Sequence, residues 1–426
     1  MTQRTLGQWL AYLEQLHPSA IDMGLDRARQ VAGQLGLSRP APRVITVTGT
    51  NGKGSTCAFL AALLQAQGLK VGVYSSPHLL HYNERVQVQG VQVSDAQLCE
   101  AFVAVEAARG DITLTYFEMG TLAAFWLFEQ AGLDAVVLEV GLGGRLDAVN
   151  LVDADLALVT SIGLDHADWL GNTRESVAFE KAGILRAGKP ALCGDLDPPA
   201  PLLEQAAALN CPFLLRGRDF SVAIDVNAWS WQGVNGAGQP LVLTDLPLLD
   251  LPMENAALAL QAYALLDLPW QPGVLAEALS GTRIVGRLDR RVLRWKGKTL
   301  NLLLDVGHNP HAARFLAQRL VQRPVPGKRL AVFGLLGDKD LEGVVAELVA
   351  GVAHWAVTPL PTSRSTPVEQ LQACLQNLGA SVTSYQNVAQ ALLAQCEQAM
   401  ADDEILLFGS FYCVAEALEW LADHAD

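Results

Sequence analysis

The sequence predicts an α/β fold divided into two domains, and three observations indicate it. A chain of 426 residues is longer than one ordinary domain. Apolar runs alternate with helix-like stretches from Arg43 to about Gly194, which is typical of a parallel sheet covered on both faces. A second, shorter alternation follows in the last third of the chain. We expect a first domain over residues 1–284, a linker over 285–297 and a smaller domain over 298–426.

The expected strands of the first domain are apolar runs that lie behind turn or loop signals. They are RVITV, KVGVYSS, DAVVLEV, LALVTSI and KPALCG. After Cys211, alternating residues and an Asn-Gly turn predict a small antiparallel sheet. The strands expected in the second domain are NLLLDV, RLAVFGLL, HWAVTPL and EILLFGSF.

Charge and cysteine content exclude several classes of protein. The chain has 30 Lys and Arg against 44 Asp and Glu, a formal net charge of −14, which argues against a nucleic-acid or anionic-membrane partner. Seven cysteines without a CxxC pair indicate neither a disulfide framework nor a zinc site. The N-terminal stretch is an amphipathic helix pattern rather than a signal peptide, and no apolar run approaches the ~20 residues needed to span a bilayer. We expect a reduced, cytoplasmic protein that need be no more than a monomer.

The stretch TGTNGKGS, residues 48–55, has the context of a phosphate-binding loop. It follows an expected strand and precedes an expected helix. Backbone N–H groups at a helix N-terminus and the charge of Lys53 would attract phosphate, and Ser55 or Thr56 could place a hydroxyl near a metal-bound phosphate. The loop is shorter than the common pattern, and Gly54 separates the lysine from the hydroxyl residue. The alternative is a turn that merely needs glycine.

Two further polar residues stand at expected strand ends. Glu139 closes DAVVLE and precedes GLGG and Arg145, so it could hold Mg²⁺ beside the phosphate loop. His166, behind Asp165 and the strand LALVTSI, could bind metal or phosphate. The alternatives are a solvated strand end for Glu139 and a satisfied loop histidine for His166.

Lys181 lies in an expected helix with Asn172 as N-cap and Glu175 reaching back to it. From the residues alone, Lys181 is indistinguishable from a solvated helix lysine.

In the second domain, DVGHNPH follows the expected strand NLLLDV. Asp305 ends that strand, Asn309 is the expected N-cap and Pro310 the first helical residue. His308 and His311 flank the turn. This arrangement suits ATP or a reacting carboxylate, and it equally suits a structural turn.

The motifs TGTNGKGS, SSPHL, NERVQV, TYFE, LEVGLGGRLDAVN, LDHADWLG, EKAGI and DVGHNPH occur in this order. Together they resemble the folylpolyglutamate synthase family, and more narrowly its bacterial type that is also a dihydrofolate synthase. The resemblance runs from about Ile21 to the C-terminus and extends in outline to the Mur ligases. It implies a P-loop-type parallel-sheet ATPase domain followed by a Rossmann-like α/β domain. It also implies ATP- and Mg²⁺-dependent addition of L-glutamate to 7,8-dihydropteroate, and of further glutamates to reduced folates, through an acyl phosphate.

The resemblance implies roles for individual residues. ATP would be bound by Thr50, Asn51, Gly52, Lys53, Gly54, Ser55, Asn255, Arg287 and Asp305. Ser76, Glu139 and His166 would hold magnesium, with two metal sites in all. The pterin would lie against Asp22, Met23, Gly24, Leu25, Thr115, Tyr116, Phe117, Leu146, Asp147 and Ala148. Lys181 would carry a CO₂-derived carbamate, and Lys53, Lys181 and His308 would be the catalytic residues.

The chain departs from the family pattern at three positions, although none removes a charged or ligating group. Gly307 stands where alanine is usual, and Ser55 and Val149 stand where threonine is common. Two rival functions are a Mur-type ligase acting on a nucleotide-linked muropeptide and a nucleotide switch without ligase chemistry. The segments TYFE and IDMGL argue against the Mur-type ligase. A nucleotide switch can be told from a ligase by its ATP turnover, which would not need both an acceptor and glutamate.

Overall fold

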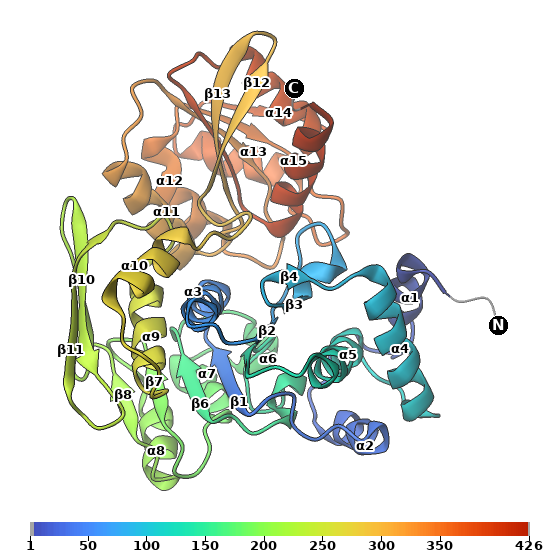
Figure 1. Ribbon diagram of the computed structural model, residues 1–426. Coiled ribbons are helices and arrows are strands. Elements are labelled where there is room, and N and C mark those ends of the chain that lie inside the picture. Colours follow the sequence, from blue (N-terminus) through green and yellow to red (C-terminus); the bar gives the residue numbers. More distant parts are fainter. Residues whose placement is uncertain (1–3, 425–426) are drawn as a thin grey trace. The chain divides into compact units, whose positions relative to one another are not determined.

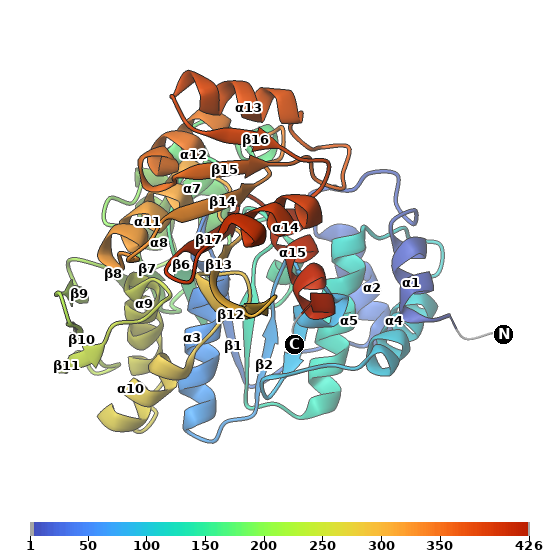
Figure 2. The ribbon, with the colours of Figure 1, turned by 90° about the horizontal axis from the view of Figure 1, so that it is seen from above.

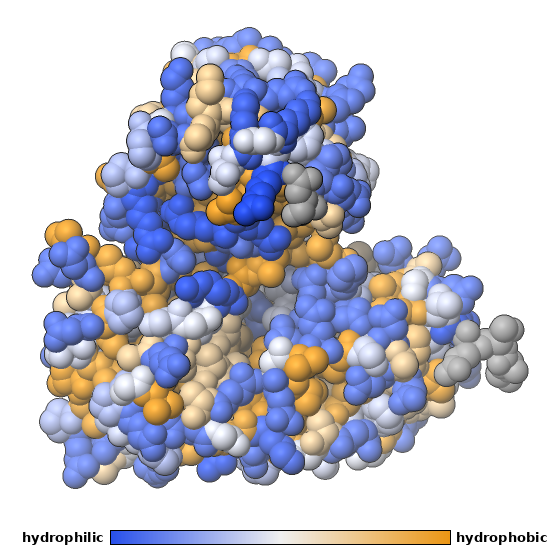
Figure 3. All heavy atoms as spheres, turned by 45° about the horizontal axis from the view of Figure 1, so that its top comes forward, coloured by the Kyte–Doolittle hydropathy of each residue, from blue (hydrophilic) through white to orange (hydrophobic). Residues whose placement is uncertain are grey.

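The computed structural model describes residues 4–424, which form two compact units that divide between Thr282 and Arg283. Each unit contains one large sheet with helices packed on it, and the first unit adds a small sheet of three strands (Figure 1). The expected α/β class is confirmed in both units. No helix in this part of the chain has both the length and the apolarity to cross a bilayer. The visible surface mixes hydrophilic with hydrophobic side chains (Figure 3).

The first unit contains an eight-stranded sheet in the order β4-β3-β2-β5-β1-β6-β7-β8. Strands β2, β5, β1, β6, β7 and β8 pair in parallel, and β3 and β4 add an antiparallel edge. The central strand β1 is buried from Val44 onward, which explains its continuous apolar sequence. The strands are β1 (Arg43–Thr48), β2 (Val71–Tyr74), β3 (Val86–Val88), β4 (Val91–Gln92), β5 (Ala135–Glu139), β6 (Leu156–Val159), β7 (Ala191–Cys193) and β8 (Phe213–Leu215).

Helices cover this sheet, and α3 lies beside α9 in both ribbon views (Figure 2). The α-helices are α1 (Leu6–Leu13), α2 (Asp26–Leu35), α3 (Lys53–Ala66), α4 (Asp95–Arg109), α5 (Tyr116–Ala131), α6 (Ala167–Leu170), α7 (Arg174–Ala182), α8 (Ala200–Ala208), α9 (Met253–Ala264) and α10 (Pro272–Gly281). Two 3₁₀ turns are η1 (Tyr82–Arg85) and η2 (Ala148–Leu151). The expected antiparallel sheet is confirmed as β9 (Ser221–Ile224), β10 (Ala228–Val234) and β11 (Pro240–Pro247).

The expected cap of α7 is wrong by one residue. The N-cap is Thr173 rather than Asn172, and its hydroxyl accepts from the Ser176 amide at 3.1 Å. The Ser176 hydroxyl, rather than Glu175, accepts from the Thr173 amide, which completes the capping box. Threonine and asparagine are both good N-caps, so the local sequence alone did not decide between neighbouring positions.

The second unit contains a six-stranded sheet in the order β12-β13-β17-β14-β15-β16, parallel except for the β12–β13 hairpin. Its strands are β12 (Asp289–Trp295), β13 (Lys298–Asp305), β14 (Arg329–Phe333), β15 (His354–Val357), β16 (Val382–Ser384) and β17 (Glu404–Phe408). Its helices are α11 (Pro310–Gln322), α12 (Leu341–Leu348), η3 (Val349–Gly351), α13 (Val368–Asn377), α14 (Val388–Gln398) and α15 (Phe411–His424).

The expected linker over residues 285–297 is wrong. Most of this segment forms β12, which is hydrogen-bonded along its length to β13. Its charged residues mark an edge strand with one solvated face, and charges are common on edges because they oppose pairing with other chains. One of them, Arg290, forms an ion pair at 2.7 Å with the buried Glu404 of the same sheet.

Candidate functional site

The loop between β1 and α3 has the geometry of a phosphate cradle. It leaves the carboxyl end of the central strand and enters α3 at Lys53. The N-cap is Gly52, which has φ 88° and no side chain to cap the first amides. The first turn of a helix has no intrahelical partners for its N–H groups, and its dipole favours an anion. The predicted phosphate loop therefore has the required backbone.

Side chains from the loop after β6 hold this cradle in place. Thr160 Oγ1 donates to the Asn51 carbonyl at 2.6 Å. Thr50 Oγ1 donates to the Gly163 carbonyl and accepts from the Gly163 amide, both at 2.9 Å. A Cβ on Gly49 would lie only 1.8 Å from Thr160 Oγ1, so a glycine is needed there. Our sequence reasoning missed Thr160. The signal for it was a hydroxyl residue at the end of a neighbouring strand.

Lys53 lies over the same loop. Its ammonium group donates to the carbonyl of Gly49 at 2.9 Å and to that of Thr50 at 3.4 Å. The predicted charge is thus held beside the amides that would receive phosphate.

Asn255 reaches the loop from α9, 200 residues further along the chain. Its Nδ2 donates to Ser55 Oγ at 2.7 Å, and Ser55 Oγ donates to the Gly52 carbonyl at 3.1 Å. A Cβ on Gly52 would lie 2.7 Å from Asn255 Oδ1. The structure therefore brings this predicted ATP residue to the predicted loop.

Glu139 points toward the same place from the next strand. It ends β5, pairs in register with Val47 and is 5% exposed. Its Oε2 accepts from the Ser76 amide at 3.2 Å, and a Cβ on Gly54 would lie 3.7 Å from Oε2. The carboxylate therefore faces the first turn of α3, beside a second predicted metal residue.

The residues present fit Mg²⁺ held jointly with a nucleotide. Among residues 4–424, no group of three or more His, Cys, Asp or Glu side chains forms a self-sufficient metal site. Mg²⁺ at nucleotide sites commonly uses one or two carboxylates, phosphate oxygens and water, and Glu139 with Ser76 meets that need. His166, exposed at φ 52° on the loop after β6, stays a predicted ligand.

Lys181 is buried, so the interpretation of a solvated helix lysine is wrong. It is 2% exposed near the end of α7. Burial, reinforced by the charge of Lys53, lowers the pKa of its amine to about 7, against the opposing effect of Asp165 and Asp147. A signal was present in the sequence, since Val177 precedes Lys181 by four residues and helical spacing places both on one face.

Two of the predicted pterin segments meet at the end of β5. Asp147 accepts hydrogen bonds from the amides of Leu142 at 2.8 Å and Val149 at 2.9 Å. Burial raises the pKa of this carboxyl to about 6, although those hydrogen bonds lower it. A Cβ on Gly141 would lie 2.7 Å from the Phe117 ring and 3.3 Å from Asp147 Oδ2. Glycine therefore lets Phe117 and Asp147 stand side by side.

Arg27 links two of the predicted pterin segments, residues 22–25 and 115–117. Arg27 forms ion pairs with Asp22 at 2.7 Å and with Glu118 at 3.2 Å. Glu118 belongs to the capping box in which the Thr115 hydroxyl accepts from its amide. Residues 22–25 and 115–117 are thereby held together at the start of α5.

The predicted residues of the second unit gather around its DVGHNPH turn. Asp305 is buried and accepts from the amides of Leu288 at 2.9 Å and Gly307 at 2.7 Å. Burial raises its pKa, and the charge of Arg287 opposes the rise. His308 Nδ1 lies 2.9 Å from the Val306 carbonyl. Roles for Arg287, Asp305 and His308 in ATP binding or catalysis stay predictions.

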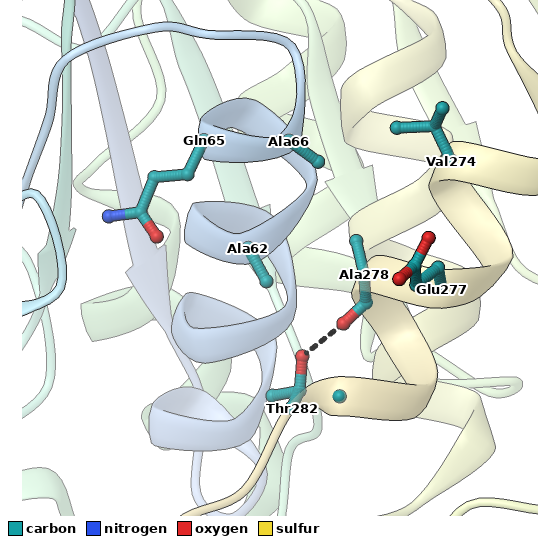
Figure 4. A pocket seen from close by; sticks show the side chains of 8 residues that line it. Ala62, Gln65, Ala66, Val274, Glu277, Ala278 and Thr282 are labelled. Atoms are coloured by element: carbon teal, nitrogen blue, oxygen red, sulfur yellow. Dashed lines mark hydrogen bonds between the residues drawn. The ribbon is translucent and has the colours of Figure 1, made fainter.

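A separate hollow of about 430 Å³ lies between the far half of α3 and α10 (Figure 4). Ala62 and Gln65 line one side, and Val274, Glu277 and Thr282 line the other. The Thr282 hydroxyl donates to the Ala278 carbonyl at 2.9 Å. No residue predicted to bind ATP, metal or pterin lines this hollow.

Comparisons with known proteins identify the family of this chain. Residues 47–194 match the Mur ligase middle domain, and residues 286–411 match the Mur ligase glutamate ligase domain. The dihydrofolate synthase/folylpolyglutamate synthase of Escherichia coli K12 is 45% identical over 414 residues, which are 97% of this chain and 95% of that protein.

Solved structures of similar proteins match nearly the whole chain. E. coli FolC in complex with DHPP and ADP has a TM-score of 0.92 and 44% identity, with 99% of this chain and 98% of that chain covered. A bifunctional folylpolyglutamate synthase/dihydrofolate synthase with Mn, AMPPNP and L-glutamate bound has a TM-score of 0.89 and 45% identity, with 98% of both chains covered. This chain therefore belongs to the dihydrofolate synthase/folylpolyglutamate synthase family of Mur ligase-like proteins.

Proposed function

We propose that the protein uses ATP and Mg²⁺ to join L-glutamate to 7,8-dihydropteroate and to extend reduced folates with further glutamates. The observation that carries this proposal is the meeting of a glycine-capped phosphate loop, Lys53 and the buried Glu139 at one edge of the sheet. The relatives of known structure support it, since they bind ADP or AMPPNP together with DHPP or with Mn and L-glutamate.

The chemistry makes an amide from a carboxylate and an amine. The γ-phosphoryl group of ATP passes to the acceptor's carboxylate, which leaves ADP and an acyl phosphate. The α-amine of glutamate then attacks the acyl carbon, and phosphate leaves as the new C–N bond forms. Lys53 and the first amides of α3 would stabilise the negative charge on the transferring phosphoryl group.

Mg²⁺ bound at this site would neutralise phosphate charge. Glu139 and Ser76 would hold one ion, with His166 as a further ligand, and a second ion would lie nearby. The described residues supply only part of each coordination shell, so the rest would come from phosphate and water.

Lys181 would act as a carbamate. Its neutral amine would attack CO₂ and lose a proton, which converts a buried cation into a buried anion. A pKa of about 7 makes the neutral amine available near physiological pH. The product would support the second metal ion.

The acceptor would be bound by the segments around Asp22, Phe117 and Asp147. Further substrates would be L-glutamate and ATP, and a monomer would suffice. All seven cysteines are free thiols, which suits a reducing cytoplasm.

The test is ADP release with ATP, Mg²⁺, L-glutamate and 7,8-dihydropteroate, with each component omitted in turn. We expect release only when all four are present, with dihydrofolate as product. Activity with tetrahydrofolate but not dihydropteroate would restrict the protein to chain extension. ATP turnover that is indifferent to pterin and glutamate would refute the proposal and favour a nucleotide switch.

A further inference from the structure

Arg85 is a buried arginine that no predicted role explains. It ends η1, directly before β3, and is 9% exposed. Its Nε donates to His78 Nδ1 at 2.8 Å. Its guanidinium carbon lies 5.2 Å from the centre of the Tyr82 ring and 5.6 Å from that of Tyr116. The Tyr74 hydroxyl also interacts with the Arg85 side chain.

No carboxylate neutralises this cation. Among the residues that the structure describes, none forms an ion pair with Arg85. The adjacent Glu84 turns its carboxylate to the amides of residues 79–81, each at 2.7 Å. His78 Nδ1 accepts the hydrogen bond from Arg85 Nε, so His78 gives Arg85 an acceptor but no negative charge. A buried charge without a counterion is costly, which implies that an anionic partner is missing.

The surroundings of Arg85 belong to the proposed acceptor site. Tyr116 is itself one of the predicted pterin residues. Tyr74 lies 6.0 Å from the Phe117 ring, centre to centre, and Phe117 stands beside Asp147. The planar guanidinium presents paired N–H groups that match a carboxylate, and ring faces on two sides favour a cation.

We propose that Arg85 binds a carboxylate of the pterin-containing acceptor, an inference that rests on the proposed function. Two carboxylates have this chemistry. One is the carboxylate that reacts, which is the benzoyl carboxylate in dihydropteroate and the γ-carboxylate of the terminal glutamate in a folate. The other is the α-carboxylate of the terminal glutamate in a folate, which does not. Either would supply the counterion that the folded chain lacks.

The test compares Arg85→Met and Arg85→Lys with the wild-type enzyme. We expect Arg85→Met to raise the KM for the acceptor roughly 10- to 100-fold, the range for a lost charge-assisted hydrogen bond, with a smaller rise for Arg85→Lys. The KM for ATP should not change. Arg109→Met is the matched control, because Arg109 is a half-buried arginine of the same unit that already pairs with Glu106.

The two acceptors distinguish the two carboxylates. A higher KM for tetrahydrofolate alone would assign Arg85 to the α-carboxylate, and a higher KM for both acceptors would assign it to the group at the reacting end. The shift in Tm that tetrahydrofolate causes without ATP should shrink in Arg85→Met and persist in Arg109→Met. Unchanged acceptor KM values, or a rise confined to L-glutamate, would overturn the inference. A wild-type enzyme that forms no glutamyl product would instead overturn the proposed function.

Discussion

Each unit has a strand followed by a turn and a helix N-terminus, β1 and α3 in the first unit and β13 and α11 in the second. The two turns differ in whether side chains accept hydrogen bonds from the first amides of the helix. In the first unit, Gly52 caps α3 without a side chain, so the first amides stay available to a ligand. In the second unit, Asn309 caps α11 and its side chain accepts from the Ala312 amide at 2.9 Å. Asp305 accepts from the Gly307 amide of that turn and from the amide of Leu288, the residue before β12.

The difference lies in whether the side chains of the turn occupy the first amides of the helix. The second turn satisfies its own donors, as an ordinary helix start does. The first turn leaves its helix amides without a side-chain cap and adds the charge of Lys53. Thr160 and Asn255, which come from other segments of the chain, contact this loop and hold its conformation. We therefore propose that the first turn binds phosphate, which four changes to the chain or its conditions would test.

The largest effect should come from removing the charge of the first turn. Lys53→Met should lower glutamate-dependent ADP release by roughly 10³-fold or more, because the charge on the transferring phosphoryl group loses its cation. Steady-state kinetics measures this. Lys70→Met is the control, an exposed lysine beyond the other end of α3 that should leave the rate unchanged. If the Lys53→Met enzyme released ADP at a rate within a few-fold of the wild-type rate, phosphate binding by the first turn would be contradicted.

A smaller effect is expected from removing CO₂. Carbamate formation needs the neutral amine of Lys181, whose folded pKa of about 7 lies below that of an ordinary lysine. The neutral fraction therefore rises with pH, from about a tenth at pH 6 to about nine-tenths at pH 8. Enzyme depleted of CO₂ should lose activity, and bicarbonate should restore it roughly tenfold faster at pH 8 than at pH 6 when CO₂ concentration is matched.

The control for this experiment is Lys181→Met, which should be weakly active and indifferent to bicarbonate. Full activity of a wild-type enzyme in which mass spectrometry under non-acidic conditions finds only free lysine would contradict the carbamate.

Next in size is the glycine cap itself. Gly52→Ala places a side chain at φ 88° and 2.7 Å from Asn255 Oδ1. The left-handed conformation costs an ordinary residue roughly 1–2 kcal/mol, so the KM for ATP should rise about tenfold. Gly33→Ala, in the open interior of α2, is the matched control and should leave this KM unaltered. Equal KM values for ATP in Gly52→Ala and the wild type would mean that ATP does not bind to the loop between β1 and α3.

The smallest effect should come from removing the Asn309 cap in the turn of the second unit. Asn309→Ala removes the cap of α11 and should lower the free energy of unfolding by about 1 kcal/mol, as chemical denaturation would measure. Asn309→Asp should restore most of the loss, because aspartate caps as well. If Asn309→Ala raised the KM for ATP at unchanged stability, the second turn would also bind ATP. The proposed difference between the two turns would then be wrong.

Local rules made much of this molecule predictable. Continuous apolar runs marked the parallel strands, Asn309 and Pro310 marked the start of α11, and the glycines of residues 48–55 marked a turn that must approach other atoms closely. These features depend on a residue and its near neighbours. The error at β12 has the same origin, because a charged edge strand and a linker are alike in composition.

The sequence by itself determined the fold class, the phosphate loop and the residue types that carry charge, because backbone preferences and hydrophobic spacing act over a few residues. Only the tertiary structure decided that Asn255 contacts Ser55 across 200 positions, that Lys181 is buried and that Arg85 has no counterion in the described chain. Burial and the distance between charges set these properties, and both depend on which distant segments the folded chain brings together.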